Sequence, residues 1–310
     1  MTRFFSRLAL VALLLASASC ANPVYVVGMK FVYRRAPLPA SQVLGNVAYE
    51  MASGSPKQRL DLYMPAPSAT RWPTVIFIHG GSWNWGDRSL KVGGADIYGN
   101  IGRFLAAHGY GAAVISYRLL PEVNWREQAG DVVQAIRWVY ETTPAYGGRR
   151  DAIVLMGHSA GAQLAARAAF DASRLREAGV PVSALRGLIA VSGAGYDLAD
   201  QETYDLGHDP AAYAKRFQLS PSDTGWREAA SVLPLVHRQV PPVLVMYAGG
   251  ETAPLVRQSQ LLARALQAAG VPTTVLQPPG MSHSRIVPAL SRADRPAGQA
   301  VLAFLKEILP

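Results

Sequence analysis

The segment IVLMGHSAGAQLAARAAF, at residues 153–170, constrains the fold of this 310-residue chain more than any other. The apolar run from Ile153 to Met156 is typical of a strand buried on both faces. Residues 163–170 are rich in alanine, a strong helix former. Between them lies a G-x-S-x-G pentapeptide centred on Ser159. The glycines allow a sharp strand-to-helix turn, which places the serine hydroxyl at the N-terminal end of a helix, where negative charge is favoured.

Short apolar runs alternate with helical patterns along the rest of the chain. The expected strands cover residues 58–65, 74–81, 110–117, 153–156, 185–193, 241–250 and 272–280. The expected helices cover residues 98–109, 126–143, 163–170, 254–269 and 297–308. This order predicts an α/β fold with a mostly parallel central sheet and helices on both faces. Residues 195–232 interrupt the alternation without a strand and are predicted to form a lid or binding insert.

Composition limits the classes of partner. Half of the residues are hydrophobic, which is enough for one domain, expected at residues 45–310. The net charge of +9 falls to +4 from residue 36 onward (25 basic minus 21 acidic residues). Because no basic helix or zinc motif accompanies that charge, we expect no nucleic-acid partner. The single cysteine excludes an intramolecular disulfide and a cysteine zinc cluster, and no cofactor or metal is implied.

The N-terminus has the pattern of an export signal. Arg3 and Arg7 precede an apolar run of about ten residues and then small residues, which predicts a signal peptide over 1–21 and a leader over 22–44. Three interpretations stay open: plain export, a bacterial lipoprotein tethered to a membrane through acylated Cys20, and an uncleaved anchor. We expect an exported, bacterial protein in either of the first two cases, and the sequence does not define its oligomeric state.

A serine nucleophile needs a base and an acid that orients the base. His283 lies in the loop after the last expected strand, where this fold places its catalytic histidine. Glu251 directly follows the strand at 241–250 and is the candidate acid. His79 and His158 lie inside the two glycine turns and are interpreted as structural.

The segment HGGSWNWG, residues 79–86, predicts an oxyanion hole. Its glycines let backbone N–H groups turn inward after a strand, and we expect the donors to be the N–H groups of Gly81, Ser82 and Ala160. Four aromatic residues are candidates for an apolar substrate pocket: Trp83, Trp85, Tyr196 and Trp226.

Together, HGGSWNWGD, VISYRLLPE, IVLMGHSAGAQLAA, PPVLVMYAGGE and GMSHSRIV resemble an α/β-hydrolase family. It is the carboxylesterase type with an HGG-x-W oxyanion motif, which includes hormone-sensitive-lipase-like esterases, arylformamidases, prenylcysteine methylesterases and feruloyl-esterase-like (BD-FAE) domains. The resemblance covers residues 45–310 and implies a triad of Ser159, Glu251 and His283. Two residues depart from the common pattern: Ser82 replaces a third glycine, and Glu251 replaces an aspartate.

The resemblance implies a serine hydrolase that cleaves carboxylic esters through an acyl-enzyme. Two alternatives stay open. The first is an arylformamidase, which would use the same residues on a formyl amide, and the second is a non-catalytic binding protein on the same fold. Acyl-chain preference and the natural substrate cannot be inferred from these motifs.

Overall fold

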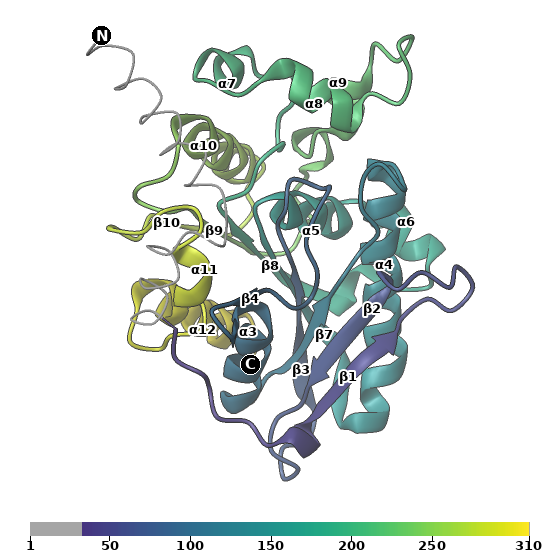
Figure 1. Ribbon diagram of the computed structural model, residues 1–310, viewed down its shortest axis with the longest axis vertical. Coiled ribbons are helices and arrows are strands. Elements are labelled where there is room, and N and C mark those ends of the chain that lie inside the picture. The colour runs from purple at the N-terminus through teal and green to yellow at the C-terminus, as the bar shows by residue number, and fades with distance from the viewer. Residues whose placement is uncertain (1–32, 310) are drawn as a thin grey trace, which may run out of the picture.

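The computed structural model describes residues 33–309, and its centre is a twisted eight-stranded sheet (Figure 1). The strands in chain order are β1 (Val43–Ala48), β2 (Arg59–Tyr63), β3 (Trp72–Ile78), β6 (Gly111–Ile115), β7 (Gly148–His158), β8 (Leu185–Val191), β9 (Val243–Met246) and β10 (Thr273–Leu276). Their spatial order is β1-β2-β6-β3-β7-β8-β9-β10. The pairs β1–β2 and β2–β6 are antiparallel, and all others are parallel. The predicted mostly parallel sheet is therefore confirmed.

Two edge features were not expected from the sequence. Strand β1 pairs with β2 through a register shift at Asn46, whose φ of 60° lies in the left-handed region. A central Gly-Asn pair lowers strand propensity, so β1 has no clear apolar alternation in the sequence. The second feature is a hairpin of two short strands, β4 (Lys91–Val92) and β5 (Ala95–Asp96), which leads into helix α3.

Helices cover both faces of the sheet. The helices of the described chain are α3 (Ile97–Ala107), α4 (Trp125–Thr142), α5 (Ala160–Phe170), α6 (Ala172–Glu177), α7 (Gln201–Asp205), α8 (Pro210–Phe217), α9 (Trp226–Ala230), α10 (Ala253–Ala268), α11 (Ile286–Ala289) and α12 (Pro296–Ile308), of which α7, α8 and α9 belong to the insert at residues 195–232. The short 3₁₀ turns are η1 (Ala40–Gln42), η2 (Thr143–Tyr146), η3 (Val182–Ala184) and η4 (Leu233–Leu235). Among the helices within residues 33–309, none combines the length and apolarity needed to span a bilayer.

Alternate residues of each strand build two separate cores. Phe77 and Met156 point to the face that packs with α3, α11 and α12. Ile76 and Leu155 point to the opposite face, which packs with α4, α5 and α10. Because side chains alternate along a strand, strands buried on both faces read as continuous apolar runs, which is how they were recognised in the sequence.

The turn between β7 and α5 is tight enough to require glycine on both sides of Ser159. A Cβ atom added to Gly157 would lie 2.2 Å from the carbonyl oxygen of Gly161, and one added to Gly161 would lie 2.2 Å from that of Ile78. Ser159 itself has φ 56° and ψ −124°, which is a strained conformation for a residue with a side chain. The predicted strand–turn–helix is present, and its serine follows the carboxyl end of β7.

The insert at residues 195–232 contains α7, α8 and α9 and has no strand. It lies beyond the sheet, next to α10 (Figure 1). Arg257 on α10 ties it down with ion pairs to Asp200 at 2.8 Å and to Glu202 at 2.8 Å. The hydrogen bond from Arg257 lowers the pKa of Asp200 to about 2. The insert is therefore anchored by charge as well as by packing.

Asp200→Asn tests this anchor. Because the pKa of Asp200 is lower in the folded than in the unfolded chain, its charge stabilises the fold above the unfolded value, near pH 4, and this contribution disappears as pH falls towards about 2. We expect Asp200→Asn to lower the free energy of unfolding at neutral pH and the difference from wild type to shrink as pH falls from about 4 towards about 2, measured by urea titration. Asp205→Asn, an exposed change at the other end of α7, is the control. A difference that does not shrink over this pH range would contradict this assignment.

Candidate active site

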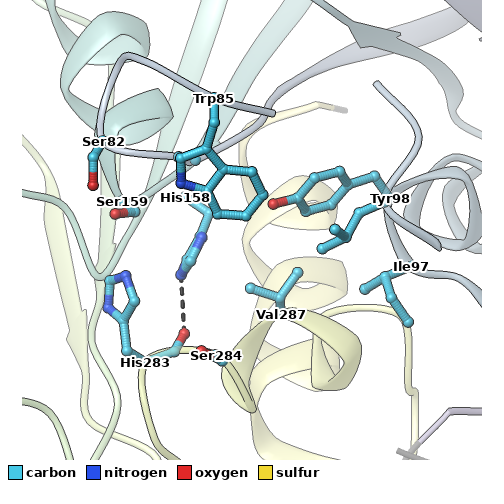
Figure 2. A pocket seen from close by; sticks show the side chains of 12 residues that line it. Ser82, Trp85, Ile97, Tyr98, His158, Ser159, His283, Ser284 and Val287 are labelled. Carbon is cyan, nitrogen blue, oxygen red and sulfur yellow. Dashed lines mark hydrogen bonds between the residues drawn. The ribbon is translucent and has the colours of Figure 1, made fainter. Parts of the chain in front are cut away.

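The three predicted catalytic residues follow the carboxyl ends of three parallel strands. Ser159 follows β7, Glu251 comes soon after β9, and His283 lies in the loop after β10. Parallel strands end at the same edge of a sheet, so the topology brings these loops together. Ser159 and His283 line one cavity of about 360 Å³ (Figure 2).

His283 and Glu251 form a direct hydrogen bond. Nδ1 of His283 donates to Oε2 of Glu251 at 2.9 Å, and the Glu251 side chain has no solvent exposure. Burial raises the pKa of the Glu251 carboxyl, but the hydrogen bonds it accepts outweigh this effect and lower its pKa overall. With Nδ1–H bound to the carboxylate, the neutral ring carries its lone pair on Nε2, the nitrogen that a base needs.

Ser192 supports the acid and was missed in the sequence analysis. This buried serine directly follows β8, and its hydroxyl hydrogen bond to Glu251 is one of the contacts that lower the pKa of the carboxyl. Its Oγ also accepts a hydrogen bond from the backbone N–H of Ala248, at 3.3 Å. The available signal was its position: like Ser159 and Glu251, Ser192 follows the carboxyl end of a parallel strand.

Ser159 is placed beside the base without being bonded to it. Its hydroxyl makes no hydrogen bond with any other residue in the range 33–309, and it points towards the space above the ring of His283 in Figure 2. Catalytic hydrogen bonds of free enzymes are often long and shorten when substrate binds. The arrangement is that of a nucleophile and base on one cavity wall, with the acid behind the base.

The predicted oxyanion loop packs directly on the serine turn. A Cβ added to Gly80 would lie 3.0 Å from Cβ of Ser159, which is closer than an ordinary van der Waals contact. Gly81 and Ser82 follow with φ values of 128° and 49°. Within the described part of the chain, the N–H groups of Gly81, Ser82 and Ala160 donate no hydrogen bond to another residue. Three unpaired donors near a nucleophile are what an oxyanion hole requires.

His158 contacts the loop that carries His283, as a buried residue that holds other segments in place. Its Nε2–H donates to the carbonyl oxygen of His283 at 3.0 Å, drawn as the dashed line in Figure 2. Burial, with a smaller contribution from His283, lowers the pKa of His158 well below its ordinary value. A neutral ring is therefore held between the serine turn and the histidine loop, and it connects the segments that carry Ser159 and His283.

The cavity walls correct part of the predicted pocket. Trp85, which is 49% exposed, lines the cavity, as predicted. Trp83, Tyr196 and Trp226 do not: they are buried in the core at 3%, 0% and 3% exposure. The remaining apolar walls are formed by Leu90, Ile97, Tyr98 and Val287. The sequence located aromatic residues near the site but gave no means of separating core packing from pocket lining.

Two further observations concern metal binding and the role of the insert at residues 195–232. Across residues 33–309, no group of three or more His, Cys, Asp or Glu side chains is arranged to hold a metal ion. Of the described residues that line the cavity, none comes from the insert at 195–232, which had been expected to shape it.

Comparisons with known proteins agree with the fold and with the family that the motifs indicate. The BD-FAE family model matches residues 60–266. The probable isoprenylcysteine alpha-carbonyl methylesterase ICME of Oryza sativa subsp. japonica is 29% identical over 256 residues, which cover 79% of this chain and 59% of that protein. Esterase LipC of Mycobacterium tuberculosis is 28% identical over 264 residues, covering 82% and 63%. Esterase B from Lactobacillus Rhamnosis (HN001) superposes with a TM-score of 0.72 at 25% identity, covering 96% and 93%. The chain thus spans about 60% of the length of the first two relatives.

Glu251→Gln tests the assignment of the acid. Glutamine carries no charge to stabilise a protonated His283, and its amide can favour the wrong tautomer, so the rate at which a fluorophosphonate labels Ser159 should fall by about 10²- to 10⁴-fold. Labelling followed by intact mass spectrometry gives this rate. Glu228→Gln, an exposed change in the insert, is the control. Near-normal labelling of Glu251→Gln would mean that another residue orients His283.

Proposed function

The chain belongs to the BD-FAE family, whose model matches more than half of it, and we propose that it is a serine hydrolase that cleaves carboxylic esters. The observation that carries the proposal is the His283–Glu251 hydrogen bond of 2.9 Å at the edge of the cavity that Ser159 lines. The matched relatives named as esterases support the same reaction class.

The residues account for each proton in the reaction. Oγ of Ser159 attacks the ester carbonyl carbon while Nε2 of His283 takes its proton, and buried Glu251 stabilises the resulting imidazolium. The carbonyl oxygen becomes negative and is bound by the three unpaired backbone N–H groups. His283 then protonates the leaving alcohol. Water repeats the sequence on the acyl-enzyme, with His283 as base, and releases the carboxylic acid.

The cavity favours small apolar groups. Its walls combine Trp85, Leu90, Ile97, Tyr98 and Val287, and among residues 33–309 no Asp, Glu, Lys or Arg side chain lines it. A volume of about 360 Å³ lies at the lower end of the range for small-molecule pockets. We therefore assign one compact apolar substituent of the ester to this cavity, with Trp85 at its exposed side.

An arylformamidase is the second candidate, because Ser82 in place of a third glycine points towards the arylformamidase and methylesterase branches. The same serine, histidine and backbone donors would act on a formyl amide. Ester and formyl amide differ in the leaving group, so direct competition between the two substrates decides between them.

A p-nitrophenyl ester series from acetate to palmitate tests the proposal, with N-formylkynurenine as the additional substrate. We expect turnover of the short esters, because the cavity is small, and loss of at least about 10³-fold in kcat for Ser159→Ala, which removes the nucleophile. Preference for N-formylkynurenine would establish the arylformamidase. Folded protein that turns over none of these substrates and is not labelled by a fluorophosphonate would favour a binding protein.

We also propose that the protein is exported from a bacterial cell, either as a free protein or tethered to a membrane through acylated Cys20. The support is the Arg3/Arg7, apolar and small-residue pattern of residues 1–21, all of which lie outside the described residues. Growth with an alkyne fatty acid that labels the wild type but not Cys20→Ser would support the tether. An unlabelled wild type in the extracellular or periplasmic fraction would instead support plain export, and an uncleaved N-terminus would support an anchor.

A further inference from the structure

Helix α8 of the insert packs against the loop that carries two of the oxyanion donors. Tyr213, Arg216 and Phe217 are spaced by three and four positions and lie on one face of the helix. The ring of Phe217 meets that of Trp83 edge-on with centroids 4.8 Å apart, and the ring of Tyr213 lies 6.1 Å from it. Both aromatic contacts fall on the residue that follows Ser82.

Arg216 adds a polar contact to the same loop. Its Nε–H donates to the carbonyl oxygen of Ser82 at 3.2 Å. Its Nη1 donates to the carbonyl oxygen of Ala212, one turn back in α8. The bond to Ala212 fixes the guanidinium relative to α8. The bond to Ser82 therefore holds the loop at a defined position relative to the helix.

The loop needs this support because of its backbone. Ser82 and Trp83 have φ values of 49° and 64°, in the left-handed region that residues with a Cβ seldom adopt. Trp83 is also fixed from the sheet side, since its Nε1–H donates to Gln163 and its carbonyl oxygen accepts from Gln128. The carbonyl of Ser82, which belongs to one of the two donor residues, accepts its hydrogen bond from Arg216 of α8 instead.

We infer that α8 is a clamp for the oxyanion loop and that Arg216 is a positioning residue for the N–H groups of Gly81 and Ser82. This role rests on the proposed hydrolase reaction. Donors that are fixed in advance stabilise a developing oxyanion better than donors that must reorient. The insert then serves the transition state, although none of its residues lines the cavity of Ser159.

Arg216→Met in the full-length protein tests the clamp, because methionine keeps part of the apolar stem and removes both hydrogen bonds. We expect kcat for p-nitrophenyl acetate to fall by about 10- to 100-fold, less than the 10²- to 10³-fold cost of deleting a donor outright. KM and the melting temperature should stay near the wild-type values. Arg216→Lys, which retains one donor, should recover part of the loss, and Lys215→Met, on the exposed neighbouring cation, should have no effect.

Two further measurements separate positioning from a general structural role. Affinity for a boronic acid, which forms a tetrahedral adduct with serine, should fall in parallel with kcat/KM. Amide hydrogen exchange at Asn84 and Trp85, whose N–H groups both bond to the carbonyl of Gly81 at 3.1 Å, should accelerate in Arg216→Met and not in Lys215→Met. Exchange needs no turnover, so it tests the clamp even if the wild type hydrolyses no ester. Unchanged exchange in Arg216→Met, or unchanged turnover in an active enzyme, would overturn the inference.

Discussion

The site depends on the close approach of the serine turn to strand β3. Gly161 lies so near the carbonyl of Ile78 that an added Cβ would be 2.2 Å from it, and Gly80 approaches Ser159 from the same strand end. These contacts hold Ser159 at a positive φ, with its hydroxyl above the sheet and the N-terminus of α5 behind it. Because the turn packs closely against β3, the HGG loop that continues β3 is placed beside Ser159.

Burial of charge is the second constraint. The Glu251 carboxylate has no exposure, so it stays ionised through the hydrogen bonds it accepts from His283 and Ser192. His158, by contrast, is buried without a charge. Its neutral ring donates a hydrogen bond from Nε2–H to the carbonyl oxygen of His283. The loop that carries His283 is thus held at two points: Glu251 binds the ring of His283, and His158 binds its backbone carbonyl.

The insert at residues 195–232 has a different role in the structure from the one that the sequence suggested. Its position and its lack of strands were predicted, and they suggested a cover for the pocket. The structure instead turns its aromatic residues inward, where Phe217 lies 4.8 Å from Trp83 and 6.5 Å from Trp226. Arg257 ties the insert to α10 through Asp200 and Glu202. Packing of this kind buries large aromatic area and leaves the cavity of Ser159 to be formed by other segments.

Local patterns in the sequence determined the parallel sheet, the family and the positions of Ser159, Glu251 and His283 as candidates, because buried strands and glycine turns are written in consecutive residues. Tertiary structure decided the rest. It joined His283 to Glu251 across 32 positions, added Ser192 as a support for the acid, and buried Trp83, Tyr196 and Trp226 in the core. A tryptophan in a core and a tryptophan on a pocket wall have the same local signal, and only the packing of distant segments separates them.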